Sequence, residues 1–268
     1  MRKEIILLLA LALSAPGFSR AAAGPAAGGI KWWLKDAGAV ATSPLHWEGS
    51  DFGKLGLVTA GAGLSLYLLD DYMEDRAEKL RDNEFSHLSE KVRYLGDGLV
   101  LVPLMGAAYA YGGLAGKGRL QNAALVGLES YLISGALVAA VKYSVHRPRP
   151  KTDPSFHSVS ERGFFSGGDV SFPSGHSAAA FSTARTAAWY FGDSGAAPYI
   201  SYGLASLVAW SRVNDNEHWV SDVVVGGAAG YFVADKVIKL NEARAGGTTY
   251  ALLPVYGARP GVTAFCRF

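Results

Sequence analysis

The 268-residue sequence predicts an all-α protein: an up-down bundle of about six apolar helices with a short C-terminal β-hairpin. Half of the residues are hydrophobic, so the chain can bury one large core, but it is too short for two domains of ordinary size. The apolar residues gather in six segments rich in Ala, Leu and Gly, which are too long for ordinary strands and are separated by polar or turn-rich connections. These two observations indicate one helical domain.

The first residues have the pattern of a secretory signal peptide. Residues 1–3 supply a positive start, residues 5–14 a short apolar run, and residues 21–23 a small-residue cleavage site. The run is shorter than the roughly 20 residues that a membrane-spanning helix needs, so an uncleaved anchor is the less favoured alternative. We expect residues 1–23 to be removed on export. Packing alone must stabilise the exported chain, because Cys266 is the only cysteine and no internal disulfide can form.

The six apolar segments follow a lead-in over residues 24–54 and are expected to form a helical domain over residues 55–240. In chain order they are Leu55–Leu69, Gly98–Gly116, Leu120–Val141, Ser177–Phe191, Pro198–Trp210 and Val220–Val233. Between the first two segments, residues 70–93 are charged and carry apolar residues at near-helical spacing. This stretch predicts an amphipathic connector with a solvated face.

The end of the chain has a different pattern. Residues 250–256 and 262–268 are short β-prone runs around a Gly-Ala-Arg-Pro-Gly turn. We expect residues 248–268 to form a hairpin. Because two strands alone are marginally stable, this hairpin must pack on the bundle or pair with another strand.

The charge of the chain argues against a nucleic-acid partner. The formal net charge is +2, from 25 basic and 23 acidic residues. The basic residues are interspersed with acidic ones and form no stripe of the kind that binds nucleic acid. The sequence carries no signal for an oligomeric state.

Three short polar motifs lie near the ends of the apolar segments. Lys142 is separated by six residues from Arg149-Pro150, Pro173-Ser174-Gly175-His176 opens the fourth segment, and Ser211-Arg212 is separated by five residues from His218, which precedes Asp222 by four. Alone, each motif would fit a turn or a solvated loop. In an up-down bundle these segment ends all meet, so the motifs would form a single site.

The first and third motifs combine a histidine, a carboxylate and three cations. His218 and Asp222 stand at i and i+4, so on a helix both side chains share one face. A carboxylate on one imidazole nitrogen leaves the other nitrogen free and basic, as a nucleophilic histidine requires. Lys142, Arg149 and Arg212 bring three cations from separate segment ends, a number suited to the oxygens of a phosphoryl group in transfer.

The second motif lies where a helix is expected to begin. Proline suits the first helical turn, and Gly175 lets the backbone come close to a ligand. The unpaired amides of a helix N-terminus favour an anion beside Ser174 and Gly175. His176 would lie next to that anion, where it could protonate a leaving oxygen as a general acid and then activate water as a base.

The three motifs resemble the signature of the phosphatidic acid phosphatase type 2 and haloperoxidase superfamily, with the same internal spacings. The resemblance runs from Lys142 to Asp222 in the motifs and, with the helix pattern, covers roughly residues 55–237. It implies a phosphatase that needs no metal or other cofactor and works through a phosphohistidine. It assigns His218 as nucleophile, Asp222 as its orienting partner, His176 as acid, and Lys142, Arg149, Ser174, Gly175 and Arg212 as phosphate-binding residues.

Several residues near the motifs have a second interpretation. Arg147-Pro148 could replace Arg149 as the partner of Lys142, but its spacing is two residues short, so Arg149 is preferred. Ser211 could hydrogen-bond near the site or cap a helix end, and Trp219 could line the site. The remaining histidines have no partners at metal-ligand spacing and are interpreted as surface or loop residues; they are His46, His87, His146 and His157.

The residues are compatible with four functions. The preferred one is hydrolysis of a phosphomonoester or pyrophosphate of a lipid, such as phosphatidate or a polyprenyl carrier. The alternatives are a soluble nonspecific acid phosphatase acting on small phosphoesters, a vanadate-dependent haloperoxidase, for which the chain is short, and a non-catalytic protein that binds anionic lipid headgroups. No motif in the apolar segments identifies the leaving group, and a fold analogy cannot supply it.

We expect an exported, membrane-associated enzyme whose site faces the periplasm, with a soluble periplasmic bundle as the main rival. The segments are equivocal, because the first is short for a bilayer and two others contain Glu129 and Arg185. A cleaved signal peptide followed by six spanning segments would place the site in the cytoplasm. The expectations therefore conflict unless the first segment does not cross, the signal is misread, or the bundle does not span.

Overall fold

The computed structural model describes residues 29–80, 84–152, 170–245, 249–255 and 261–267. The predicted signal peptide, residues 1–23, and His157 lie outside these ranges. All six apolar segments form helices, which confirms the predicted all-α bundle. These helices are α3 (Gly49–Leu68), α6 (Gly98–Leu114), α7 (Gly118–Val145), α8 (Gly175–Phe191), α9 (Ala197–Asn214) and α10 (Val220–Ala245).

The described residues hold nine α-helices rather than about six. The additional ones are α2 (Gly29–Ala41), α4 (Asp70–Leu80) and α5 (Glu84–Val92), and three short 3-10 turns are η1 (Ser43–His46), η2 (Arg93–Gly96) and η3 (Gly192–Ser194). The sequence prediction counted only long apolar segments. Short helices with one apolar face, such as those of the charged connector, depend on the bundle for their stability, and a search for long apolar segments does not detect them.

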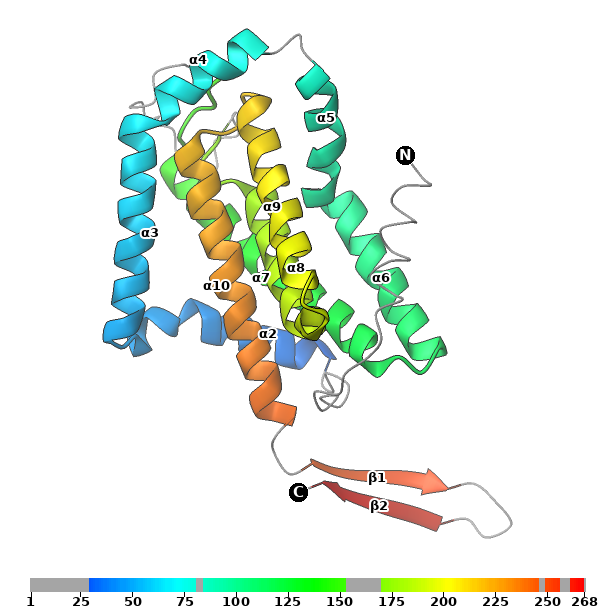
Figure 1. Ribbon diagram of the computed structural model, residues 1–268. Helices are drawn as coiled ribbons and strands as arrows, with labels where there is room; N and C mark the ends of the chain where they lie inside the picture. Colours follow the sequence, from blue (N-terminus) through cyan, green and yellow to red (C-terminus); the bar gives the residue numbers. More distant parts are fainter. Residues whose placement is uncertain (1–28, 81–83, 153–169, 246–248, 256–260, 268) are drawn as a thin grey trace.

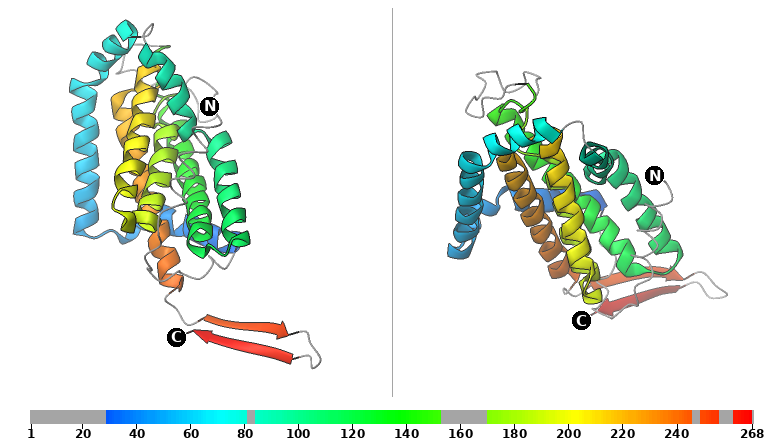
Figure 2. Two further views of the ribbon diagram at one scale, coloured as in Figure 1. Left: turned by 45° about the vertical axis from the view of Figure 1, so that its right-hand side comes forward. Right: turned by 45° about the horizontal axis from the view of Figure 1, so that its top comes forward.

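Helices α7, α8, α9 and α10 form the centre of the bundle, and successive helices run in opposite directions (Figure 1). α8 packs against α7, α9 and α10. α3 flanks the centre beside α10, and α6 flanks it beside α7. α4 lies across one end of the bundle and α2 lies across the other (Figure 2).

Two glycines of α10 allow α8 to approach closely. A Cβ at Gly226 would lie 2.3 Å from the carbonyl oxygen of Ser174, and a Cβ at Gly230 would lie 2.1 Å from that of Ala178. Both glycines share the helix face of Asp222, since the three residues are spaced by four. A larger residue at either position would push the helices apart. The glycines therefore bring the N-terminus of α8 next to that of α10.

Beyond α10 the backbone forms two antiparallel strands, β1 (Thr249–Val255) and β2 (Gly261–Arg267). Thr249 pairs with Arg267, and Val255 pairs with Gly261. The strands lie past the end of the bundle at which α10 terminates (Figure 1). That this segment is a stable hairpin, held by the bundle or by another strand, stays a prediction.

One described helix, α7, is long and apolar enough to cross a membrane. The number rises to as many as three if each of two bent helix pairs is one span: Gly49–Leu68 with Asp70–Arg76, bent by 53°, and Ser86–Gly96 with Gly98–Leu114, bent by 51°. The flanking helices expose large apolar side chains, which include Leu57, Leu64, Tyr67 and Leu68 on α3 and Leu99, Tyr109, Tyr111 and Leu114 on α6. Such extended apolar surface is typical of a protein that contacts lipid or another protein.

Candidate active site

The three motifs meet at one end of the bundle, as the up-down arrangement predicted. Lys142 lies in the last turn of α7, Ser174 caps α8, and Arg212 lies in the last turn of α9. His218 and Asp222 flank the first residue of α10. Backbone hydrogen bonds join the segments, because Ser174 N donates to Asp222 O at 3.0 Å and His218 N donates to Arg212 O at 3.1 Å.

His218 is buried beside a fully buried carboxylate. His218 is 4% exposed and Asp222 is 0% exposed. Nδ1 of His218 lies 3.6 Å from Oδ2 of Asp222, just beyond hydrogen-bond distance, and has no hydrogen-bond partner among the described residues. The same Oδ2 accepts a 3.0 Å hydrogen bond from the backbone N–H of Trp219. Asp222 is thus fixed on the Nδ1 side of the ring, so Nε2 is the nitrogen that faces away from it.

Lys142 is held at the site by the loop that leads into α8. Its Nζ donates to the carbonyl oxygens of Val170 at 2.9 Å and Ser171 at 3.1 Å. The hydroxyl of Ser171 in turn donates to the carbonyl oxygen of Pro148 at 2.9 Å. The loop after α7 and the loop before α8 therefore fix the ammonium group together.

Arg149 and Arg212 are each paired with a carboxylate of the turn between α9 and α10. Arg149 donates to Glu217, and Arg212 donates to Asp215. Nε of Arg212 is buried and has no hydrogen-bond partner in the part of the chain that the structure describes. A buried donor of this kind can be satisfied by an anionic ligand.

The second motif places a histidine beside these cations. The side chain of Ser174 caps α8 by accepting from Ser177 N at 3.4 Å, so Gly175 and His176 form the first turn of the helix. η2 packs against His176, since a Cβ at Gly96 would lie only 2.9 Å from the carbonyl oxygen of His176. The first turn of α8 therefore packs against η2 at His176.

Burial keeps both histidines neutral near pH 7. It lowers the pKa of His218 to about 4, with Asp222 acting in the opposite direction and Lys142 and Arg149 lowering it further. It also lowers the pKa of His176 to about 4, helped by the positive charge of Arg212. A neutral His218 is competent as a nucleophile. An anion bound among the cations would raise the pKa of His176 and allow it to carry a proton.

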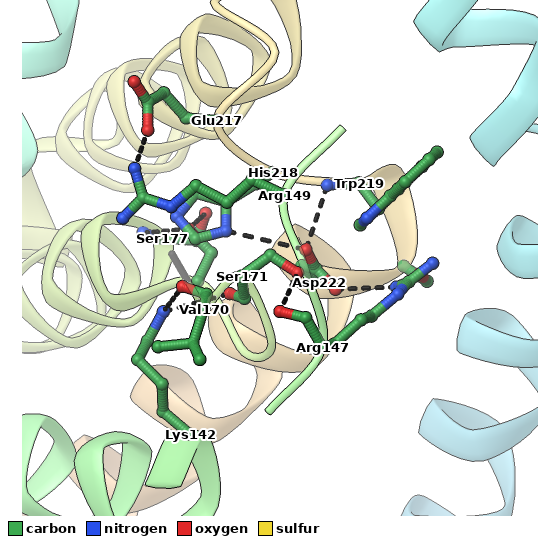
Figure 3. Close-up of polar contacts among 12 residues, drawn as sticks. Lys142, Arg147, Arg149, Val170, Ser171, Ser177, Glu217, His218, Trp219 and Asp222 are labelled. Atoms are coloured by element: carbon green, nitrogen blue, oxygen red, sulfur yellow. Dashed lines mark hydrogen bonds and ion pairs between the residues drawn. The ribbon is translucent and has the colours of Figure 1, made fainter. Parts of the chain in front are cut away.

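Arg147 lies apart from the cations around His218, on the far side of Asp222 (Figure 3). It donates to Oδ1 of Asp222 at 2.7 Å and to Oδ2 of Asp70 at 2.9 Å. The sequence pattern offered Arg147 only as a substitute for Arg149 and gave no signal for Asp70. Nothing local in the sequence could have linked Asp70 to residues about 150 positions later, because this contact exists only after the helices pack.

The remaining candidate residues take structural positions. Ser211 is fully buried, and its hydroxyl donates to the carbonyl oxygen of Val208 in its own helix at 2.7 Å. Trp219 is buried, with its Nε1 donating to Pro148 O at 3.0 Å and its ring 4.9 Å from the guanidinium carbon of Arg147. His46 and His87 are exposed, as expected. His146 differs from the expected surface residue, since it is 4% exposed where it caps α7 in a left-handed conformation.

Among the described residues, no group of three His, Cys, Asp or Glu side chains is arranged to hold a metal ion.

Residues 123–244 match the family model described as the PAP2 superfamily. A lipid A 1-phosphatase from Porphyromonas gingivalis is 30% identical over 174 residues, which are 63% of this chain and 35% of that protein. The chain thus spans about a third of the length of that relative. A probable diacylglycerol pyrophosphate phosphatase 1 from Schizosaccharomyces pombe is 27% identical over 219 residues, with 66% of this chain and 76% of that protein covered.

Two solved structures have a similar fold. A transmembrane PAP2 type phosphatidylglycerolphosphate phosphatase from Bacillus subtilis superimposes with a TM-score of 0.53 at 22% identity, over 80% of this chain and 94% of that one. Aquifex aeolicus LpxE superimposes with a TM-score of 0.50 at 23% identity, over 65% of this chain and 96% of that one. The matched family segment, residues 123–244, contains all three motifs. Through this segment, the chain is similar to members of the PAP2 superfamily.

Proposed function

We propose that the protein is a metal-independent phosphatase that hydrolyses a phosphate ester or pyrophosphate of a lipid through a phosphohistidine on His218. The observation that carries the proposal is the environment of His218. Its ring is buried, which lowers its pKa, and Asp222 lies on the Nδ1 side while the charges of Lys142 and Arg149 lower the pKa further. Arg212, with its unsatisfied buried Nε, completes a set of three cations.

In the first step, Nε2 of His218 attacks phosphorus, and the bond between phosphorus and the leaving oxygen breaks. The three cations bind the equatorial oxygens, over which negative charge is spread in the transition state. His176 donates a proton to the leaving oxygen, because the bound anion raises the pKa of this histidine. Asp222 stabilises the positive charge that the phosphorylated imidazole ring carries.

In the second step, water attacks the phosphohistidine. His176, now neutral, accepts a proton from the water as a general base. The bond between phosphorus and Nε2 breaks, inorganic phosphate leaves, and His218 returns to its neutral form. The two histidines thus divide nucleophilic and acid–base work, which agrees with their positions at the starts of α10 and α8.

Two features of the structure support a lipid substrate. The exposed apolar side chains of α3 and α6 form a surface suited to the interior of a membrane. The site lies at one end of the bundle, where the headgroup of a lipid would lie if the helices contacted its acyl chains (Figure 1). The names of both curated relatives also refer to phosphorylated lipids. A soluble acid phosphatase, the main rival, would not need the apolar surface.

The test is phosphate release by the full chain purified in detergent, in the presence of a chelator. Substrates are phosphatidate, diacylglycerol pyrophosphate, lipid A and p-nitrophenyl phosphate. We expect the best lipid to exceed p-nitrophenyl phosphate in kcat/KM, and His218→Ala to lower turnover by about three orders of magnitude or more, as loss of a nucleophile does. Acid-labile, base-stable labelling of the chain by radioactive phosphate should also depend on His218.

The matched control is His87→Ala, which removes an exposed histidine of α5 and should leave activity unchanged. Activity retained by His218→Ala would contradict the nucleophile, and activity lost to the chelator would contradict the metal-free mechanism. A preference for p-nitrophenyl phosphate would favour the soluble acid phosphatase. Halide oxidation with added vanadate would favour the haloperoxidase.

A further inference from the structure

A second arginine of the first loop lies against the catalytic carboxylate instead of the phosphate site. Arg147 is two residues before Arg149, but Figure 3 shows the two side chains on opposite sides of the pair formed by His218 and Asp222. Nη1 of Arg147 donates to Oδ1 of Asp222 at 2.7 Å, and Nη2 donates to Oδ2 of Asp70 at 2.9 Å. The guanidinium group therefore bridges two carboxylates from different helices.

This cluster is buried almost completely. The exposed fractions of the side chains are 7% for Arg147 and 0% for both Asp70 and Asp222. Charges at this depth are tolerated only when they are paired and hydrogen-bonded, and removing one partner leaves the other uncompensated. The charge of Arg147 therefore compensates the two buried carboxylates that it bridges.

Arg147 also determines which oxygen of Asp222 faces the nucleophile. Oδ1 accepts the hydrogen bond from Arg147, so Oδ2 is left to face Nδ1 of His218 at 3.6 Å and to accept from Trp219 N at 3.0 Å. The ring of Trp219 lies under the guanidinium group and supports it. A planar, forked donor suits this position, since a single ammonium group could not hold both carboxylates in the same way.

Asp70 connects α4 to the first turn of α10. Its Oδ1 accepts from the backbone N–H of Ser221 at 2.9 Å, and its Oδ2 accepts from the Ser221 hydroxyl at 2.6 Å. Ser221 is adjacent to Asp222, and its hydroxyl also accepts from Nη1 of Arg147 at 2.7 Å. Asp70 therefore fixes the helix start that carries Asp222 and fixes the arginine that binds it.

We propose that Arg147 and Asp70 are positioning residues that hold Asp222 as an oriented anion behind His218 and so set the pH at which His218 becomes a competent nucleophile. This proposal rests on the proposed function. Charged and titratable groups reach the surroundings of His218 from every element packed there. The acidic ones are Asp222 on α10, Asp70 on α4, and Asp215 and Glu217 in the turn after α9. The basic ones are Lys142 on α7, Arg147 and Arg149 in the first loop, His176 on α8 and Arg212 on α9.

The proposal predicts opposite effects for the two partners. Turnover requires neutral His218, so kcat/KM falls at low pH as His218 becomes protonated. This fall is the acid limb of the pH profile. Arg147→Met removes a nearby positive charge, which makes protonation of His218 easier and moves the acid limb to higher pH. Asp70→Asn keeps the shape and the acceptor oxygen but removes a negative charge, which moves the limb to lower pH.

The experiment is the pH profile of phosphate release by the full chain in detergent for these variants and for Arg147→Lys. We expect Arg147→Met to move the acid limb up by about one pH unit and to lower the plateau of kcat at least tenfold, with KM changed less than kcat. Arg147→Lys keeps the charge, so its limb should stay near that of the parent while its plateau falls. If Arg147→Met fails to fold, Asp70→Asn and Arg147→Lys still test the proposal.

Acid limbs that stay in place, or that move in the same direction in Arg147→Met and Asp70→Asn, would overturn the proposal and leave Arg147 a purely structural residue. Activity that survives in His218→Ala would instead overturn the proposed function. The two failures are therefore distinguishable, because only the second concerns the nucleophile itself.

Discussion

At the scale of single residues, Glu217 is the carboxylate most directly in competition with a phosphate. It accepts hydrogen bonds from Arg149 and from Nζ of Lys151, the latter at 2.7 Å. Arg149 is one of the three cations proposed to bind the substrate, so its pairing with Glu217 must loosen or be shared when an anion binds. The negative charge of Glu217 also repels that anion.

Glu217→Gln is therefore expected to tighten the binding of inorganic phosphate. The amide retains an acceptor for Arg149 but lacks the charge, and loss of one like-charge repulsion near the surface is worth on the order of 1 kcal/mol, or about fivefold in the inhibition constant. The measurement is competitive inhibition of lipid hydrolysis by phosphate. Lys151→Gln is the matched control, since it removes an exposed partner of the same carboxylate and should weaken binding slightly. Weaker binding in Glu217→Gln would mean that Glu217 mainly orients Arg149.

The residues of the three motifs could be predicted because their chemistry is local. A histidine and a carboxylate four apart share a helix face, and a Ser-Gly pair before an apolar run marks a helix N-terminus. The choice between Arg147 and Arg149 depended on spacing alone. In the structure the two side chains point to different partners, since Arg147 donates to Asp70 and Arg149 donates to Glu217.

At the scale of elements, the contact between α8 and α10 is the one on which the site most depends. Gly226→Ala would place a Cβ against the carbonyl group of Ser174. The backbone of Ser174 cannot move away from this Cβ without shifting the second motif. We expect the free energy of unfolding to fall by about 2 kcal/mol and lipid phosphate release to fall at least tenfold. Thermal unfolding in detergent and the activity assay measure these two effects.

Gly135→Ala is the matched control for that substitution. Gly135 is an exposed glycine of α7, and a Cβ there would meet nothing within 4 Å. Since alanine favours a helix over glycine by up to about 1 kcal/mol, this variant should be as stable as the parent or more so, with full activity. Equal behaviour of the two variants would show that the close packing of α8 on α10 is not critical.

At the scale of the whole molecule, the site and α2 lie at opposite ends of the bundle (Figure 2). Asp36 of α2 forms a two-pronged ion pair of 2.6 Å with Arg244, near the end of α10 that is distant from His218. If the helices cross a membrane, α2 and the site therefore face different compartments. A periplasmic site and a lead-in exported by a cleaved signal peptide are then incompatible.

Labelling of single cysteines can decide the orientation. In a Cys266→Ser background, Asp71→Cys marks the site end and Lys117→Cys marks the opposite end, and both positions are exposed. If the site faces the periplasm in a spanning bundle, as the sequence led us to expect, a membrane-impermeant maleimide should label Asp71→Cys but not Lys117→Cys in intact Gram-negative cells. Lysed cells, in which both should react, are the control.

The other labelling patterns have defined meanings. Labelling of both positions would indicate an exported bundle that does not cross the membrane, which agrees with a cleaved signal peptide. Labelling of Lys117→Cys alone would place the site in the cytoplasm and contradict the expected periplasmic site. The expected pattern would place α2 in the cytoplasm and exclude cleavage and export of residues 1–23 as a signal peptide.

The sequence by itself determined the six long helices, their up-down order and the set of motif residues that meet at one end. Each depends on a short-range pattern: runs of apolar residues, helix starts and stops, and spacings of four to seven residues. Only the tertiary structure decided that Arg147 supports Asp222, that Asp70 reaches the start of α10, and that α2 closes the end opposite the site. These contacts join residues 75 to 208 positions apart, and side-chain hydrogen bonds over such separations exist only after helix packing has brought the partners together.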